Sequence, residues 1–218
     1  MNSSMSRSSI FIIAGVVIAA AVAVSIAVSG GGSPGGTTAS VMDAVVATDH
    51  AKGNPAAKVV LIEYSDFQCP ACGAYYPLVR RIAEDYANDI AFVYRHFPLQ
   101  QHPNAIPAAR AAEAAALQGE FWEMHNIIFE HQDAWAGAAN PTDTFMGYAR
   151  EIGLIEDQFR KDYEADAGRD RAKSDFESGL GAGVNATPTF FLNGKKIENP
   201  RSYDAFKAML DEAIAQNR

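Results

Sequence analysis

The sequence has little cysteine: Cys69 and Cys72 are the only two in 218 residues. Exported domains that rely on disulfides for stability spread more cysteines along their loops. A bridge across so short a loop would also add little stability, because the entropic effect of a disulfide grows with the length of the loop that it closes. The shortage of cysteine therefore excludes a disulfide framework and points to chemistry at this one pair.

The residues needed for other uses of a Cys-x-x-Cys motif are also missing. A zinc site needs two further ligands at a matching spacing, and the chain has no second cysteine pair. Covalent haem attachment needs a histidine directly after the second cysteine, where this chain has Gly73. We therefore predict no metal, and no cofactor other than a redox-active Cys69–Cys72 disulfide.

The histidines show no spacing typical of a metal site. His125 and His131 are six residues apart, which places them on different faces of a helix. His96 and His102 have no partner at a useful spacing either. We expect each of these four side chains to be hydrogen-bonded locally in a helix or loop.

Basic residues are in the minority. The chain has 18 lysines and arginines against 26 aspartates and glutamates, a net charge of −8 and a pI near 5.1. Proteins that bind nucleic acids or anionic membrane surfaces concentrate positive charge. The acidic balance therefore argues against these partners, and we interpret it as a source of solubility.

Charge is absent altogether from residues 10–28, an apolar run interrupted only by Gly15 and Ser25. As a helix rising about 1.5 Å per residue, this run nearly matches the hydrocarbon core of a bilayer, which is about 30 Å thick. Its length favours an uncleaved transmembrane anchor. A signal peptide cut near Ala27 or Ser29 stays open as the alternative.

The charges around this run predict its orientation. Arg7 precedes it, and no lysine or arginine follows until Lys52. The positive-inside rule then places residues 1–9 in the cytoplasm and everything after the run outside it. We expect a membrane-anchored, extracytoplasmic domain, periplasmic or at the cell surface, which would be secreted if the run were cleaved. We predict a flexible linker over residues 29–50, because the first half of this segment is rich in glycine, serine and threonine.

Residues 51–218 carry the pattern of one α/β domain. An apolar run at 58–64 predicts a buried strand, helical spacing follows at 71–86, and 90–94 predicts a second strand. This order forms a βαβ unit, whose crossover is right-handed. The rest of the pattern predicts a helical insertion over about 103–182 (helices at 105–117, 120–131, 142–152 and 166–180, and a short one near Glu156), an Asn-Gly hairpin over 189–197 and a closing helix at 202–216.

The cysteine pair lies where the first strand of this unit leads into its helix. Cys69, at the first turn, would face unsatisfied backbone N–H groups and the positive end of the helix dipole. Both stabilise a thiolate and lower its pKa from about 8.5. Cys72, one turn further on, would point into the fold. We therefore predict Cys69 as the exposed attacking sulfur and Cys72 as the resolving one, with Pro70 and Ala71 completing the motif and Pro70 presetting the helical backbone.

Five segments carry a wider signature, in order: GNP (53–55), LIEYSDFQCPAC (61–72), YRHFPL (94–99), FWEMH (121–125) and GVNATPTFF (183–191). Together they resemble the DsbA-like thiol–disulfide oxidoreductases of the thioredoxin superfamily. The resemblance runs from about residue 50 to the end of the chain. A CPxC motif with a distant Thr-Pro before a strand and an Asn-Gly hairpin is a specific combination.

The resemblance implies a thioredoxin fold with the helical block inserted, and it suggests roles for three residues. Pro188 would have a cis peptide bond and lie against the cysteines, and Thr187 would offer backbone groups to an extended substrate segment. Glu63 would be a buried acid that relays a proton to or from Cys72. A trans proline that only starts a strand, and a Glu63 that faces solvent, are the alternatives.

We predict from this an extracytoplasmic thiol–disulfide oxidoreductase that introduces disulfides into exported proteins. Its partners would be exported protein thiols and a membrane quinone-linked protein that reoxidises the pair, and we expect a monomer that binds no nucleic acid. Ala71 replaces the histidine of the best-known oxidases and so removes a cation beside the thiolate. A reductase or isomerase of the same fold therefore stays open, and a non-catalytic thioredoxin-fold chaperone is the remaining alternative.

Overall fold

The computed structural model describes residues 45–217. The predictions of a cytoplasmic N-terminus and of a membrane anchor or signal peptide, and most of the predicted linker, lie outside the described residues. Among residues 45–217, no helix has the length and apolarity required to cross a bilayer.

A five-stranded sheet in the order β1-β3-β2-β4-β5 forms the centre of the fold. β2 and β3 run parallel, and each of the other neighbouring pairs is antiparallel. Every residue of β2 and β3 is buried, which explains why both strands read as nearly continuous apolar runs. The strands are β1 (His50–Gly53), β2 (Val59–Ser65), β3 (Ile90–His96), β4 (Thr189–Leu192) and β5 (Lys195–Lys196).

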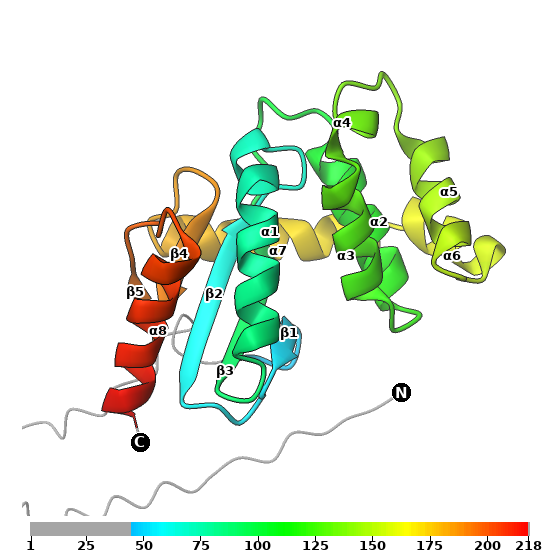
Figure 1. Cartoon of the computed structure of the whole chain (residues 1–218). Coiled ribbons are helices and arrows are strands. Elements are labelled where there is room, and N and C mark those ends of the chain that lie inside the picture. The colour runs from blue at the N-terminus through cyan, green and yellow to red at the C-terminus, as the bar shows by residue number, and fades with distance from the viewer. Residues whose placement is uncertain (1–44, 218) are drawn as a thin grey trace, which may run out of the picture. The chain divides into compact units, whose positions relative to one another are not determined.

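Helices cover both faces of this sheet (Figure 1). Alternate residues of β2 point to opposite faces, as the pleat of a strand requires. Val59 and Leu61 pack in the cluster that includes residues of α1 (Pro70–Asp85) and α8 (Tyr203–Gln216). Val60 and Ile62 pack in the cluster on the other face, against which Phe176 of α7 (Asp166–Gly181) lies.

The inserted helices pack beside the sheet around a core of their own (Figure 1). They are α2 (Ala105–Ala116), α3 (Phe121–Glu130), α4 (Gln132–Trp135), α5 (Thr142–Glu151) and α6 (Glu156–Glu164). Seven alanines of α2 are buried, and these small side chains allow neighbouring helices to approach closely. Both cysteines belong to this cluster, so the motif lies where the inserted helices meet the sheet.

The expected α/β thioredoxin arrangement with its helical insertion is present, and three differences stand out. β1 and α4 have no counterpart among the predicted elements, since each has only four residues and little periodicity. The start of the domain also differs from the predicted boundary at residue 51. Asp49 forms a buried salt bridge of 2.8 Å with Arg95 of β3, and His50 begins β1. These contacts place the end of the predicted linker inside the folded domain.

Candidate active site

Cys69 is the N-cap residue of α1, with extended backbone angles, and Pro70 is the first helical residue. The Cys69 amide donates to the Asp66 carbonyl at 3.0 Å, and the Gly73 amide donates to the Cys69 carbonyl at 3.1 Å. The Cys69 sulfur therefore sits at the open N-terminal end of the helix, where backbone N–H groups have no helical partner. Pro70 and Ala71 are exposed beside it.

The two thiols, which are not bonded to each other here, have opposite electrostatic surroundings. A hydrogen bond from Cys72 lowers the pKa of Cys69 to about 5, against the effect of burial and with help from Thr187 and the backbone amides of Cys72 and Ala71. Burial raises the pKa of Cys72 well above its ordinary value, and the charges of Cys69 and Glu63 add to this effect. Both cysteines are buried, so the prediction of an exposed Cys69 is wrong in degree: Cys69 retains 6% of its surface, whereas Cys72 has none exposed. These shifts favour a thiolate at Cys69 and a protonated thiol at Cys72 near neutral pH.

Thr187 and Pro188 lie against this pair, as predicted, although 118 residues separate Thr187 from Cys69. The Thr187–Pro188 bond is cis. When Cys69 is protonated, its thiol donates to the Thr187 carbonyl, with sulfur and oxygen 3.5 Å apart. The Thr187 hydroxyl is buried and, within the described residues, has no other hydrogen-bond partner, so it is free to donate to the sulfur when Cys69 is ionised.

Glu63 lies beneath the pair, in the interior of β2, and only 4% of its surface is exposed. Burial raises its pKa from 4.5 to about 7, and the Ser65 side chain opposes this only in part. The negative charge of Glu63 helps to raise the pKa of Cys72. Tyr94 is the residue opposite Glu63 on β3. Glu63 therefore gains or loses a proton near neutral pH at a point close to the buried sulfur.

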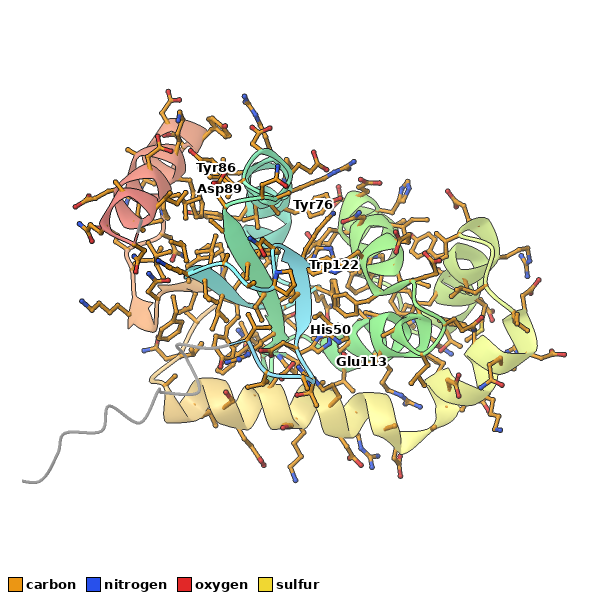
Figure 2. All side chains as sticks on the ribbon, turned by 90° about the horizontal axis from the view of Figure 1, so that it is seen from below. His50, Tyr76, Tyr86, Asp89, Glu113 and Trp122 are labelled. Atoms are coloured by element: carbon orange, nitrogen blue, oxygen red, sulfur yellow. The ribbon has the colours of Figure 1, made fainter. Side chains whose placement is uncertain are left out.

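Two polar groups around Cys72 were not predicted. The hydroxyls of Ser65 and Tyr94 are buried and have no hydrogen-bond partner in the part of the chain that the structure describes. Glu63 also borders a narrow pocket whose other lining residues include Lys52, Tyr76, Trp122 and His125. Tyr76 and Trp122 lie on the side of the molecule shown in Figure 2. No sequence pattern marks this pocket, because its walls come from β1, β2, α1, β3 and α3.

The loop before Cys69 is fixed by Asp66, which is 2% exposed. Its carboxylate accepts hydrogen bonds from the amides of Gln68 at 2.7 Å and Leu99 at 2.9 Å, and it contacts Nδ1 of His102 at 2.6 Å. The expectation of a purely local partner for His102 is wrong, since Asp66 is 36 residues away. Asp66 therefore holds the loop in place.

Gln132, the first residue of α4, clamps the same loop from the inserted helices. Its side-chain amide donates to the carbonyls of Phe67 at 2.6 Å and Cys69 at 3.0 Å. Gly73 leaves room for this amide, because a Cβ at that position would lie 2.5 Å from the Gln132 side-chain oxygen and would displace it. No local pattern predicts this role of Gln132, because it depends on the docking of a four-residue helix.

Comparison with known proteins assigns the family. The model of the Thioredoxin_4 family, described as "Thioredoxin", matches residues 46–212. The chain belongs to this DsbA-like family. It is therefore a thiol–disulfide oxidoreductase with a Cys69–Cys72 pair, as the resemblance implied.

Solved structures of DsbA type share the fold of this Thioredoxin_4 chain. The alpha-DsbA1 of Wolbachia pipientis superimposes with a TM-score of 0.73 at 20% identity, over 82% of this chain and 97% of that one. The oxidised BdbD of Bacillus subtilis gives a TM-score of 0.68 at 21% identity, over 77% of this chain and 93% of that one.

A curated relative from Salinispora tropica, called Na(+)/H(+) antiporter NhaA 3, is 38% identical over 188 residues. The match covers 84% of this chain and 28% of the relative. The Thioredoxin_4 chain thus spans about a quarter of the length of that longer protein.

Proposed function

We propose that this oxidoreductase works as an oxidase, transferring the Cys69–Cys72 disulfide to pairs of protein thiols. The observation that carries the proposal is the contrast between the thiols: the pKa of Cys69 is lowered to about 5, while that of Cys72 is raised. Thiolate stabilisation exists only in the reduced enzyme, because the disulfide carries no charge. It therefore favours reduction of the pair, which makes the disulfide a stronger oxidant.

The reaction proceeds through a mixed disulfide. A substrate thiolate attacks Cys69 of the oxidised enzyme, a substrate–Cys69 bond forms, and the bond between Cys69 and Cys72 breaks. The second substrate thiolate then attacks the substrate sulfur of that mixed disulfide and releases Cys69 as a thiolate. The substrate loses two electrons and gains a disulfide, and the enzyme gains a dithiol. The low pKa of Cys69 makes it a good leaving group in the second step.

Glu63 serves as the proton donor for the first step. Cys72 leaves as a sulfur in surroundings that disfavour its charge, so it needs a proton as the bond breaks. The Glu63 carboxyl has a pKa of about 7, which suits an acid that delivers a proton near neutral pH and is recharged afterwards. The pocket beside Glu63 gives that recharging a route toward solvent.

The surroundings of Cys69 fit an extended, uncharged stretch of substrate. Pro70 and Ala71 are exposed on one side of the sulfur, and Asn185 and Ala186 are exposed just before Thr187. Backbone groups of Thr187 would pair with such a segment in the manner of an added strand. We propose exported proteins as the substrates, with residues 10–28 as anchor and a membrane quinone-linked partner as the source of oxidising equivalents. The antiporter name belongs to the longer relative and lends no support to transport by this chain.

The redox potential of the pair tests the direction of electron flow. We expect the full-length chain, equilibrated with glutathione buffers and analysed by thiol alkylation, to have a potential well above the value of about −270 mV typical of thioredoxin. It should also introduce disulfides into a reduced, unfolded substrate, and Cys69→Ser should abolish this activity. A potential at or below that of thioredoxin would assign the chain to the reductases. Unchanged biological activity in the Cys69→Ala/Cys72→Ala protein would instead favour a chaperone.

Glu63→Gln tests the proton donor separately from direction. We expect it to slow oxidation of substrate by about tenfold to a hundredfold and to remove the pH dependence near 7. A profile that keeps its inflection near pH 7 would assign that titration to another group.

A further inference from the structure

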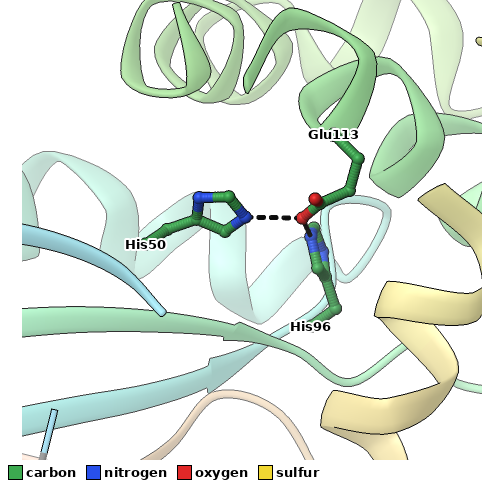
Figure 3. A group of neighbouring side chains, drawn as sticks. All are labelled: His50, His96 and Glu113. Carbon is green, nitrogen blue, oxygen red and sulfur yellow. Dashed lines mark hydrogen bonds and ion pairs between the residues drawn. The ribbon is translucent and has the colours of Figure 1, made fainter. Parts of the chain in front are cut away.

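A second cluster of reactive side chains lies away from the cysteines, where the sheet meets α2. Glu113 of α2 has one carboxylate oxygen, Oε1, within 2.6 Å of His50 Nε2 and 2.8 Å of His96 Nε2. Figure 3 shows both imidazoles pointing at this carboxylate, one from β1 and the other from the end of β3. One potential ligand atom from each of the three residues lies within 4.8 Å of the others.

We propose that His50, His96 and Glu113 form a binding site for a divalent transition-metal ion, with Zn²⁺ as the best fit. Two imidazole nitrogens and one carboxylate oxygen are the donor set that zinc accepts in sites with a fourth position open to water. Imidazole also selects this class of ion over Mg²⁺ and Ca²⁺, which prefer oxygen ligands throughout.

The spacing of the donors requires only a small adjustment to admit an ion. Zinc bonds of about 2.0–2.1 Å in tetrahedral geometry put neighbouring donor atoms about 3.3 Å apart. The nitrogen–oxygen distances of 2.6 and 2.8 Å are shorter, so the Glu113 carboxylate must retreat by about half an ångström. Glu113 reaches the cluster on a flexible side chain, and within residues 45–217 both of its side-chain hydrogen bonds involve Oε1, which leaves its second oxygen unrestrained.

The histidine rings are already held in the required direction. The His50 ring stacks on Phe121, with centroids 3.5 Å apart and planes 4° from parallel. The His96 ring meets Tyr94 edge-on at 5.3 Å. The His96 side chain is 2% exposed, while those of His50 and Glu113 are each 14% exposed. The site is thus shielded but open on one side, as entry of an ion and a bound water requires.

Charges around the cluster also suit a cation. The Asp175 carboxylate accepts a hydrogen bond from the His96 backbone amide at 3.1 Å. Arg171, the nearby cation, is paired with Asp175 at 3.0 Å and lies 3.7 Å from Asp49. Its charge is therefore offset, and the carboxylate of Glu113 remains available to the ion.

A bound ion would join three parts of the chain: the first strand, the end of a central strand and the inserted helices. In the sequence, His50 and Glu113 are 63 positions apart, and His96 and Glu113 are 17 positions apart. Their long separation explains why residue spacing gave no sign of the site. The expectation that His96 is bonded locally is wrong, because its ring contacts α2.

Zinc titration of the oxidised, full-length chain tests the proposal. Oxidation of Cys69 and Cys72 to the disulfide removes the thiolates, which would otherwise compete for the metal. After treatment with a chelator, isothermal titration calorimetry with ZnCl₂ should show one ion per chain. We expect His96→Gln and Glu113→Gln each to weaken binding by at least a hundredfold. His131→Gln is the matched control, since His131 is exposed and stacks on Tyr148 outside the cluster, and it should bind as the wild type does.

Two further measurements separate loss of ligand from loss of fold. His50→Gln changes the ligand on the edge strand, and circular dichroism and thermal unfolding of each variant establish whether the fold is retained. Co²⁺ in place of Zn²⁺ should give visible ligand-field bands of a tetrahedral nitrogen and oxygen site, without sulfur charge-transfer bands. The proposal is overturned if the oxidised chain binds no zinc, if zinc binds only to the reduced cysteines, or if folded variants at all three positions bind it as tightly as the wild type.

Discussion

Glu63 and Glu113 are two buried or largely buried carboxyl groups of one domain, and their pKa values move in opposite directions. Burial raises the pKa of Glu63 to about 7, and the opposing influence of the Ser65 side chain does not cancel it. Burial acts on Glu113 in the same direction, but hydrogen bonds from His50 and His96 outweigh it and lower the pKa to about 2. Loss of water alone therefore does not decide the charge of a buried carboxyl group; the donors that replace the water do.

This difference separates a group that moves protons from one that holds a fixed charge. Glu63 changes its protonation near neutral pH, beside a sulfur that needs a proton. Glu113 stays ionised across that range and ties two strands to a helix. Two residues link the groups: Tyr94, opposite Glu63 on β3, contacts the ring of His96, which is bonded to Glu113.

The largest expected effect is a gain of stability in Glu63→Gln at alkaline pH. The unfolded carboxyl group has its ordinary pKa of 4.5 and the folded one about 7. Between these values the folded state holds the extra proton, so wild-type stability falls as pH rises. Above pH 7 the wild type has lost about 3 kcal/mol of its free energy of unfolding. Because glutamine stays neutral, the variant should be more stable by that amount at pH 8 and equal to the wild type below pH 4.5.

Urea unfolding of the oxidised protein, followed by tryptophan fluorescence, measures this gain. Glu84→Gln is the control, since the exposed Glu84 only pairs with Arg80 on the surface, at 3.0 Å. A difference between wild type and Glu63→Gln that is the same at pH 4 and pH 8 would show that burial does not raise the pKa of Glu63.

Glu113→Ala should have the opposite effect on stability. In chelator-treated protein we expect it to lower the free energy of unfolding by about 2 kcal/mol, because two imidazoles lose a charged acceptor. Glu130→Ala makes a matched comparison. Glu130 also accepts from two donors, Tyr76 at 2.9 Å and Arg80 at 2.6 Å, but it is 42% exposed. Glu130→Ala should lower the free energy of unfolding by less than about 1 kcal/mol in the same urea experiment. Equal losses in the two variants would mean that burial adds nothing to the Glu113 contacts.

Glu63 was within reach of sequence reasoning, whereas Glu113 was not, and the reason is physical. Glu63 interrupts an apolar strand six residues before Cys69, at a position where the family resemblance implies a buried acid. Local patterns predicted the parallel strands, α1 and most of the inserted helices. The cluster of His50, His96 and Glu113 depends instead on β1 adding to the sheet edge and on α2 docking, and both are tertiary events without a local signal.

The residues that support the redox site divide in the same way. Cys69, Cys72 and Pro70 follow from a motif at a strand-to-helix junction. Thr187 and Pro188 followed only from the family resemblance, because nothing local connects them to a cysteine 118 residues away. Gln132 escaped both routes, since its hydrogen bonds to the loop exist only once α4 has packed beneath it.

The smallest expected effect sharpens the contrast at Cys69, where donors again outweigh burial. Thr187→Val removes a hydroxyl that has no other partner within the described chain, while keeping the shape of the side chain. Loss of one hydrogen bond to a thiolate, about 1.5 kcal/mol, should raise the pKa of Cys69 from about 5 to about 6 and make the potential about 30 mV more negative.

The ultraviolet absorbance of the thiolate against pH measures the first change, and glutathione equilibration measures the second. Thr189→Val is the control, because the Thr189 hydroxyl donates to the Ala186 carbonyl at 2.7 Å and not to sulfur. If the pKa of Cys69 stays near 5 in Thr187→Val, the thiolate is held by Cys72 and the helix N-terminus alone, and the residue before Pro188 has no part in setting the potential.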